Sequence, residues 1–324
     1  MFMLSDQDQL ECVNLRQALH QHAELSNEEV NTSKKIIEFM NALQPDEIIT
    51  HIGGAGLAVC FGSSDNGESI LFRCELDALP INETIELAYG SCHQGISHKC
   101  GHDGHMAILA GVARYYAKNR PTNGRIILLF QPAEETGEGA FNILQDERFL
   151  ALNPDYVFAL HNVPGYPFGK VLIKENTFSC ASQGATISFQ GKPAHAAQPE
   201  TGTSPVLAVN ELVDALHHIP DSVCGKSSLT FATVVGINVG EKAFGTAPMK
   251  GEVYATLRSD CDESMQAMVT FIEHKAKQLA KDHKLTYQIG FEDVFAATVN
   301  APSAVSIVKK ALPTNVVENL TTPF

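Results

Sequence analysis

Residues 99–108 read KCGHDGHMAI, which places one cysteine and two histidines within six positions. A thiolate and imidazoles are ligands that divalent transition metals accept, so Cys100, His102 and His105 could belong to a metal site. The same residues could instead be a thiol nucleophile and its base. That alternative is disfavoured, because at most four residues separate the thiol from the base and because it leaves the later pair Glu134–Glu135 without a role.

The first half of the chain alternates helical and strand-like stretches. Amphipathic periodicity predicts helices over 6–22, 28–43 and about 103–118. Short apolar runs typical of buried strands cover 56–62, 69–79, 124–131 and 156–162. Strands that alternate with helices predict an α/β domain with a mixed, mostly parallel sheet.

Further polar side chains come at or just after the ends of three of these strands. Asp77 lies near the end of 69–79, Glu134 and Glu135 follow 124–131, and His161 lies near the end of 156–162. Ligands of open α/β sheets bind outside the carboxyl ends of the strands, so we expect these groups to converge with the CGHDGH segment. The sequence therefore predicts a site for a divalent transition metal.

Other histidines are less informative. In HQHAE, His20 and Glu24 are expected to share a helix face four residues apart, but no strand end lies beside them, so a structural or supporting role is favoured. His93 and His98 fall in a loop and are given no role.

The second half has a different order of elements. It reads strand, helix, strand, strand, helix, strand, which is the ferredoxin-like βαββαβ pattern of a self-contained small domain. We therefore expect an inserted domain at 179–292, between two parts of a metal-binding domain at 1–178 and 293–324, the last part holding one helix near 303–312. The expected elements are 184–191, 204–219, 228–237, 251–259, 263–283 and 285–291.

Composition sets outer bounds on function. With 324 residues and 44% hydrophobic content, the chain is long enough for two domains. Its net charge of −14 disfavours a nucleic-acid or anionic-membrane partner. No stretch approaches the roughly 20 apolar residues of a membrane span. The eight cysteines are scattered and the N-terminus does not read as a signal peptide, so a cytoplasmic protein is expected.

Several motifs together resemble the aminoacylase and hippurate-hydrolase family of metallo-amidohydrolases, which act on N-acyl amino acids, hippurate and auxin conjugates. The resemblance runs in order from about residue 12 to 312, and CGHDGH with QPAEE is its most specific part. It implies an α/β metal-binding domain with an inserted lid. The motifs are RQALHQHAELSNEE, RCELDALP, KCGHDGHMAILAG, FQPAEETGEGA, ALHNVPGYPFG and GKPAHAAQPETGTSPVLAV.

The resemblance also implies a role for individual residues. Two divalent ions (Mn, Zn, Co or Ni) would activate a bridging water, with Glu134 as the general base and a small N-acyl amino acid as substrate. A homodimer through the lid is also implied. The implied metal ligands are Cys100, His102, Glu135 and His161. Asp77 is implied to support the metal centre, and Asp103 to lie behind the ligands. His195 is implied to bind the substrate carbonyl and Arg258 the substrate carboxylate.

This chain departs from the family pattern at three places. Glu75 stands where an aspartate is usual, with little effect expected because Asp77 is intact. Residues 237–253 replace the usual Asn-Val-Ile-Pro segment, which changes the expected contacts with the substrate carboxylate. The family's last histidine ligand follows the lid, whereas the last histidine here is His283, inside it. An incomplete metal shell and an uncovered sheet edge are therefore expected.

Two functions remain as alternatives to hydrolysis of N-acyl amino acids. One is a truncated, non-catalytic protein that binds metal or acyl-amino acid, and the other is a dipeptidase or aminopeptidase of the same clan.

Overall fold

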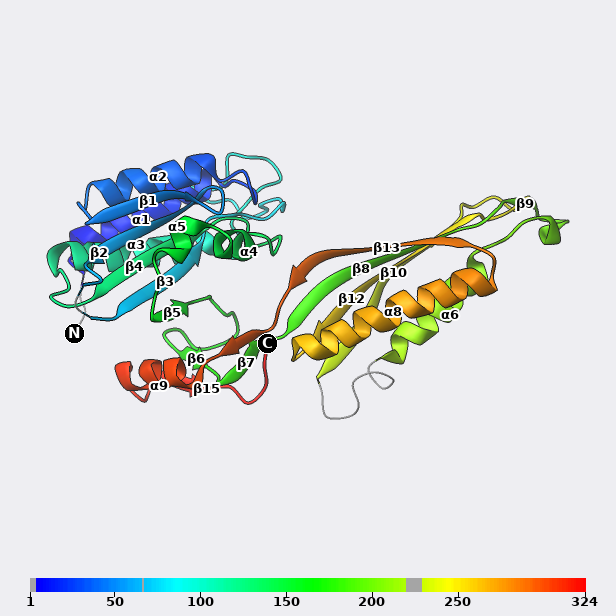
Figure 1. Cartoon of the computed structure of the whole chain (residues 1–324). Coiled ribbons are helices and arrows are strands. Elements are labelled where there is room, and N and C mark those ends of the chain that lie inside the picture. Colours follow the sequence, from blue (N-terminus) through cyan, green and yellow to red (C-terminus); the bar gives the residue numbers. More distant parts are fainter. Residues whose placement is uncertain (1–3, 66, 220–228) are drawn as a thin grey trace. The chain divides into compact units, whose positions relative to one another are not determined.

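The computed structural model describes residues 4–65, 67–219 and 229–324, and Figure 1 shows its elements in chain order. The chain divides into two compact units, residues 1–166 and 167–324, each described here by itself. The three-part division expected from the sequence stays a prediction. No described helix is both long and apolar enough to cross a membrane.

The first unit contains a five-stranded sheet in the order β1-β2-β4-β3-β5. Strands β1 and β2 run antiparallel to their neighbours, whereas β3 pairs in parallel with both β4 and β5. The predicted mixed sheet is confirmed, with β1 as a strand that the sequence did not reveal. The strands are β1 (Glu47–Ile52), β2 (Gly56–Gly62), β3 (Ser69–Glu75), β4 (Arg125–Gln131) and β5 (Tyr156–Ala159); the helices are α1 (Asp6–Gln21), α2 (Val30–Asn41), α3 (His102–Lys118), α4 (Gly139–Leu144) and α5 (Glu147–Leu150).

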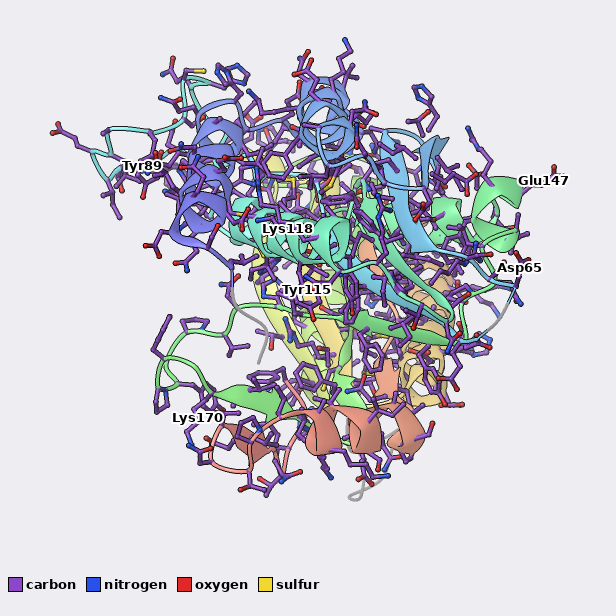
Figure 2. All side chains as sticks on the ribbon, turned by 90° about the vertical axis from the view of Figure 1, so that its left-hand side faces the viewer. Asp65, Tyr89, Tyr115, Lys118, Glu147 and Lys170 are labelled. Atoms are coloured by element: carbon purple, nitrogen blue, oxygen red, sulfur yellow. The ribbon has the colours of Figure 1, made fainter. Side chains whose placement is uncertain are left out.

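Helices cover both faces of this sheet. Along β2 successive side chains point to opposite faces, so Val59 packs with α1, α2 and α3 while Cys60 packs on the other side with Ile143 of α4. In Figure 2, Tyr115 and Lys118 mark the C-terminal half of α3. Burial on both faces explains why β2 and β4 read as unbroken apolar runs.

The strand register sets where the polar side chains meet. Glu75 at the end of β3 lies opposite Gln131 at the end of β4, and Arg73 lies opposite Ala159 at the end of β5. Because these three strands are parallel, and β5 ends only two residues short of β3, the segments that follow them start at one edge of the sheet. Strand β3 stops at Glu75, earlier than predicted, so Asp77 lies in the segment beyond it.

The second unit contains a four-stranded antiparallel sheet in the order β10-β12-β8-β13. This is the ferredoxin-like order, in which the first and third strands in the chain occupy the centre. Helices α6 and α8 pack on one face through a core that includes Leu212 and Ile272. Ser228, the first residue of one predicted strand, lies outside the described residues. The elements are β8 (Ala181–Gln190), α6 (Val206–His217), β10 (Thr230–Val239), β12 (Lys250–Ser259), α8 (Asp262–Asp282) and β13 (Thr286–Phe295).

Short strands complete the second unit. The helix predicted near 303–312 is confirmed as α9, but the last segment also holds two strands that were not predicted, β14 and β15, which pair with β7 and β6. Strand pairing depends on distant partners, so the local pattern did not reveal these three-residue strands. These elements are β6 (Val171–Ile173), β7 (Asn176–Ser179), β9 (Ala194–His195), the 3-10 helix η1 (Pro199–Thr201), β11 (Thr246–Ala247), β14 (Thr298–Asn300), α9 (Pro302–Ala311) and β15 (Val317–Asn319).

Candidate metal centre

A glycine turn delivers the CGHDGH segment to the edge of the sheet. Gly101 immediately precedes α3 and has a φ of 101°, which is strained for residues with a Cβ. A Cβ at this position would lie 2.4 Å from Oδ1 of Asn162, in the segment after β5. Glycine therefore permits both the turn and the close approach of the two segments.

The residues predicted as ligands lie close together. Sγ of Cys100 is 3.2 Å from Nε2 of His161. Nε2 of His102 is 3.7 Å from Oε2 of Glu134 and 3.7 Å from Oε1 of Glu135. His102 belongs to three groups of potential metal ligands, and two of them hold predicted site residues only: one with Cys100 and His161, the other with Glu134 and Glu135. In each group the ligand atoms are within 4.8 Å of one another.

Unpaired buried atoms show that this donor set suits a cation. Nε2 of His102, Oε1 of Glu135 and Oδ1 of Asp77 are buried and have no hydrogen-bond partner. Leaving such atoms unpaired is costly, and most buried polar atoms in proteins are satisfied. Imidazole nitrogen, carboxylate oxygen and thiolate sulfur are ordinary ligands of zinc and related divalent metals, so the residues present fit such an ion.

Asp77 contacts two of the predicted ligands, His102 and Glu135. Its Oδ2 accepts hydrogen bonds from the backbone N–H of Glu135 at 2.9 Å and from Oγ of Ser26 at 2.7 Å. Burial alone would raise the pKa of Asp77, but these bonds and its contact with His102 lower it, which keeps the carboxylate ionised.

The ring orientation of His102 is also fixed. Its Nδ1 lies 2.8 Å from the backbone carbonyl of Asp77, which can only accept, so Nδ1 carries the proton and Nε2 faces the glutamates. Burial opposes protonation of the ring, but Asp77, Cys100 and Glu75 together raise the pKa of His102 to about 11. The surroundings therefore favour positive charge at this position, as a cation site requires.

Glu134 differs from its neighbours in its exposure. Its side chain is 26% exposed, whereas those of Asp77 and His102 are fully buried. Burial of much of the group and the nearby charge of Glu135 raise the pKa of Glu134. A carboxylate with a raised pKa and partial access to solvent is suited to exchange a proton with a reacting molecule.

Sequence reasoning placed His105 in the cluster but missed its two partners, Glu75 and Asn162. Nδ1 of His105 lies 2.7 Å from Glu75, and its Nε2 lies 2.7 Å from Oδ1 of Asn162. Glu75, His102 and His105 form another group of potential ligands. The available signal was that His105 follows His102 by three positions, which puts both side chains on one face of α3.

Asp103, next to His102 in the chain, is buried and contacts residues of α1. Its Oδ2 is 3.0 Å from Nδ1 of His20 and 3.0 Å from Nε of Arg16. The expected supporting role of His20 agrees with this geometry. The expected shared helix face of His20 and Glu24 is wrong: α1 ends at Gln21, and Glu24 lies beyond it and accepts hydrogen bonds from Thr32 at the start of α2.

The two predicted substrate-binding residues, His195 and Arg258, belong to the second unit. Exposed His195 ends β9, and its Nδ1 accepts a hydrogen bond from the backbone N–H of Ala197 at 3.1 Å. In the neutral ring the proton must then be on Nε2, which is left free to donate. Arg258 is exposed near the end of β12.

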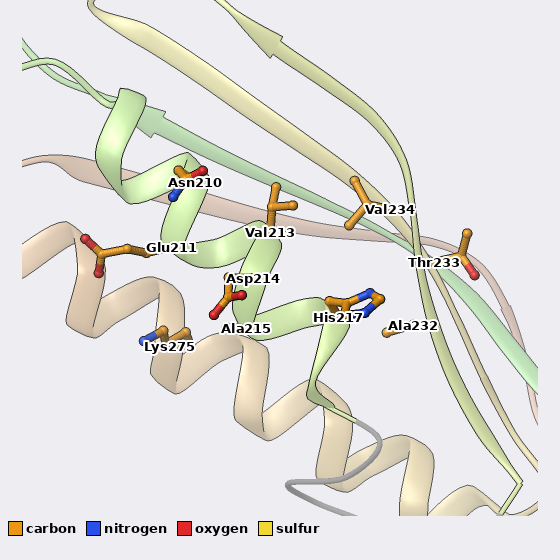
Figure 3. A pocket seen from close by; sticks show the side chains of 10 residues that line it. All are labelled: Asn210, Glu211, Val213, Asp214, Ala215, His217, Ala232, Thr233, Val234 and Lys275. Carbon is orange, nitrogen blue, oxygen red and sulfur yellow. The ribbon is translucent and has the colours of Figure 1, made fainter.

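The second unit also contains a hollow. It has a volume of about 940 Å³ and is lined by residues of α6, β10 and α8 (Figure 3). His217 and Lys275 contribute the basic groups and Glu211 and Asp214 the acidic ones. None of its lining residues is a predicted metal ligand or substrate-binding residue.

The mixed sheet with helices on both faces, and the imidazole, thiol and carboxylate groups beyond its parallel strands, define an α/β protein with a candidate metal centre. Residues 71–323 match the family described as peptidase family M20/M25/M40. The chain belongs to this family. The resemblance found in the motifs, and with it the prediction of a metallo-amidohydrolase, is confirmed at this level.

Named relatives and solved structures agree with this assignment. The chain is 31% identical to an N-acetyldiaminopimelate deacetylase of Priestia megaterium, over 86% of this chain and 72% of the relative. It is 35% identical to an N-acetyl-L-cysteine deacetylase of Bacillus subtilis, over 70% of this chain and 54% of the relative. An aminohydrolase structure from methicillin-resistant Staphylococcus aureus superposes with a TM-score of 0.87 at 26% identity, covering 98% of this chain and 84% of that one. A dinuclear metal-binding peptidase of the M20 family from Bacillus subtilis shares the fold, with a TM-score of 0.77 at 24% identity, over 99% of this chain and 84% of that one.

Proposed function

We propose that this protein hydrolyses the amide bond of N-acyl amino acids at a centre of two divalent metal ions. The observation that carries the proposal is the pair of buried, unpaired atoms, Nε2 of His102 and Oε1 of Glu135, 3.7 Å apart beside an acidic side chain with a raised pKa. Family membership and the deacetylase names of the relatives support amide bonds of N-acyl amino acids as the target.

The proposed ligands follow from the cluster. Cys100, His102, Glu135 and His161 hold the metal ions, and Asp77 orients His102 and Glu135 through the contacts described above. Mn, Zn, Co and Ni are all compatible with such a mixed ligand set. When bound, the ions lower the pKa of water and polarise the substrate carbonyl.

Glu134 moves the proton in the proposed reaction. It takes a proton from the attacking water and returns it to the nitrogen of the departing amine, which its raised pKa favours. His195 donates a hydrogen bond from Nε2 to the carbonyl oxygen as negative charge develops there. Arg258 binds the substrate carboxylate.

The second unit is proposed to act as a lid and as the contact between two copies of the chain. Strand β10 is an edge of its sheet and exposes Phe231, Val235 and Ile237 on its surface. An exposed apolar edge strand favours pairing with another chain. The cytoplasm remains the expected compartment.

The test combines metal content with a hydrolysis assay. The protein is loaded with manganese or zinc, desalted and measured by elemental analysis, and release of acetate is followed with N-acetyl-L-cysteine, other N-acetyl amino acids and free dipeptides. Glu134→Gln should retain the metal content and lower kcat by about 100-fold or more, as expected for loss of a general base. The control is Glu138→Gln, an exposed glutamate of the same loop.

Each result decides between the candidate functions. About two manganese ions per chain and hydrolysis of acetylated substrates support the proposal. Cleavage of free dipeptides with no action on acetylated amino acids would assign a peptidase. Bound metal or acyl-amino acid without turnover would assign a non-catalytic binding protein, and an unchanged rate in Glu134→Gln would exclude Glu134 as the base.

A further inference from the structure

A second group of potential metal ligands lies outside the candidate centre. It consists of His22, which follows α1, and of Cys92 and His93 in the long loop between β3 and α3. One ligand atom from each residue lies within 4.8 Å of the other two. All three residues are exposed, so an ion can reach them directly from solvent. No predicted ligand of the candidate centre belongs to this group.

Hydrogen bonds hold the loop beside the end of α1. The backbone N–H of Cys92 donates to the carbonyl of Gln21 at 2.9 Å, and its Sγ donates to the same oxygen at 2.8 Å. Nδ1 of His93 lies 2.9 Å from the carbonyl oxygen of Ala23. The backbone bond of Cys92 and the contact of His93 remain when an ion binds, so they hold the loop and the His93 ring in place beforehand, which lowers the entropic cost of forming a site. The S–H bond of Cys92 is exchanged for a bond to the ion.

The carbonyl of Ala23 also fixes the tautomer of His93. A carbonyl oxygen can only accept, so Nδ1 of His93 carries the proton and Nε2 presents its lone pair. This is the arrangement usual for metal-binding histidines, whose other ring nitrogen donates to a carbonyl or carboxylate. Nδ1 of His22 lies 3.5 Å from Sγ of Cys92, so these two potential ligand atoms are already close.

We propose that His22, Cys92 and His93 form a separate zinc site. Zinc binds thiolate at about 2.3 Å and imidazole at about 2.0–2.1 Å in a tetrahedral arrangement, which places neighbouring ligand atoms roughly 3.5 Å apart. Binding displaces the thiol proton of Cys92 to solvent, and water fills the fourth position. The ion joins the end of α1 to the loop that leads into the CGHDGH segment, closing a loop between residues 70 positions apart.

The experiment uses the full chain in a Cys100→Ser background, which removes the thiol of the candidate centre. Cobalt is added as the probe, because a cobalt–thiolate bond gives a strong near-ultraviolet charge-transfer absorption. The absorption should persist in Cys100→Ser, disappear when Cys92→Ser is added, and persist when Cys261→Ser is added instead. Cys261 is a matched control, because it lies in the second unit and belongs to no group of potential ligands among the described residues.

Zinc content in the otherwise unchanged protein gives an independent measurement. Cys92→Ser and His93→Ala should each bind one zinc fewer per chain than the parent, whereas Cys261→Ser should match the parent. Equal zinc content in all variants, or a cobalt–thiolate absorption that survives Cys92→Ser, would overturn the proposal. Neither measurement depends on hydrolytic activity, so failure here is distinct from failure of the proposed function.

Discussion

Glu29 provides a sharp test of how the fold positions the loop that carries Glu134. Its side chain is fully buried, and its Oε1 accepts a hydrogen bond from the backbone N–H of Ala133 at 2.6 Å. Ala133 has a φ of 47°, in the left-handed region that residues with a Cβ rarely adopt. Such a conformation persists only where its surroundings fix it. We therefore infer that Glu29 holds Ala133, and with it the direction of Glu134.

The expected cost of Glu29→Ala follows from these contacts. Loss of the acceptor leaves a buried N–H unpaired, at about 1–3 kcal/mol. The deleted side-chain atoms leave a cavity that adds about 2 kcal/mol. Oε2 of Glu29 has no hydrogen-bond partner, so its removal returns about 1 kcal/mol. The net expectation is that the free energy of unfolding falls by about 2–4 kcal/mol.

Urea denaturation measures this change, and two further variants interpret it. Glu28→Ala removes an exposed neighbouring glutamate and should change stability by less than about 0.5 kcal/mol. Glu29→Gln keeps a carbonyl oxygen for the N–H of Ala133 and should lie within about 1 kcal/mol of the parent. Metal affinity should fall in Glu29→Ala and be retained in Glu29→Gln.

Two outcomes would refute this reasoning. If Glu29→Ala is as stable as Glu28→Ala, the hydrogen bond to Ala133 does not support the loop. If Glu29→Gln loses as much stability as Glu29→Ala, the carboxyl group acts through its charge or its second oxygen and not as the acceptor for Ala133.

Three further predictions test other contacts. Hydrogen bonds from Lys118 and Ser5 lower the pKa of Asp8 below its ordinary value near 3.8. The stabilising effect of the ionised Asp8 side chain is therefore present above that pH and is lost as the pH falls further. Acid titrations of the free energy of unfolding should show a smaller loss in Asp8→Asn than in the parent, and equal slopes would contradict this. Gly101→Ala should destabilise the protein by at least about 1–2 kcal/mol in thermal or urea unfolding, because Gly101 has a positive φ and Asn162 approaches it closely. An unchanged unfolding midpoint would show that the turn adapts. An ion that binds the native state stabilises it, so a chelator should lower the Tm of the metal-loaded parent. The same chelator should lower the Tm of His102→Ala by less. Equal decreases in Tm would place the stabilising metal elsewhere.

Much of the fold was predictable because its signals are local. The apolar run of 56–62 coincides with β2, and the helix expected near 103–118 coincides closely with α3. The βαββαβ order of the second unit was also readable, since each element is long enough to show its own periodicity. The three-residue strands β14 and β15 were missed because they depend on partners far along the chain. Strand β1 was missed although its partner β2 follows it directly.

The candidate site shows the same division. Cys100, His102 and Glu135 were identified from residue type and from their place after strands and before a helix. The roles of Glu29 and Asn162 could not be read, since each acts through a contact with a segment more than 50 positions away. Nothing in the local pattern of either residue indicates that partner.

The sequence by itself determined the type of elements, the family and the set of chemical groups available at the ends of the strands. Only the tertiary structure decided which of these groups face one another. Its parallel register brings the ends of β3, β4 and β5 to one edge of the sheet. Beyond that edge, Nε2 of His102 lies 3.7 Å from Oε2 of Glu134 and has no hydrogen-bond partner. The physical reason is that residue type and periodicity are local properties, whereas register and the burial of unpaired polar atoms arise only when distant segments pack together.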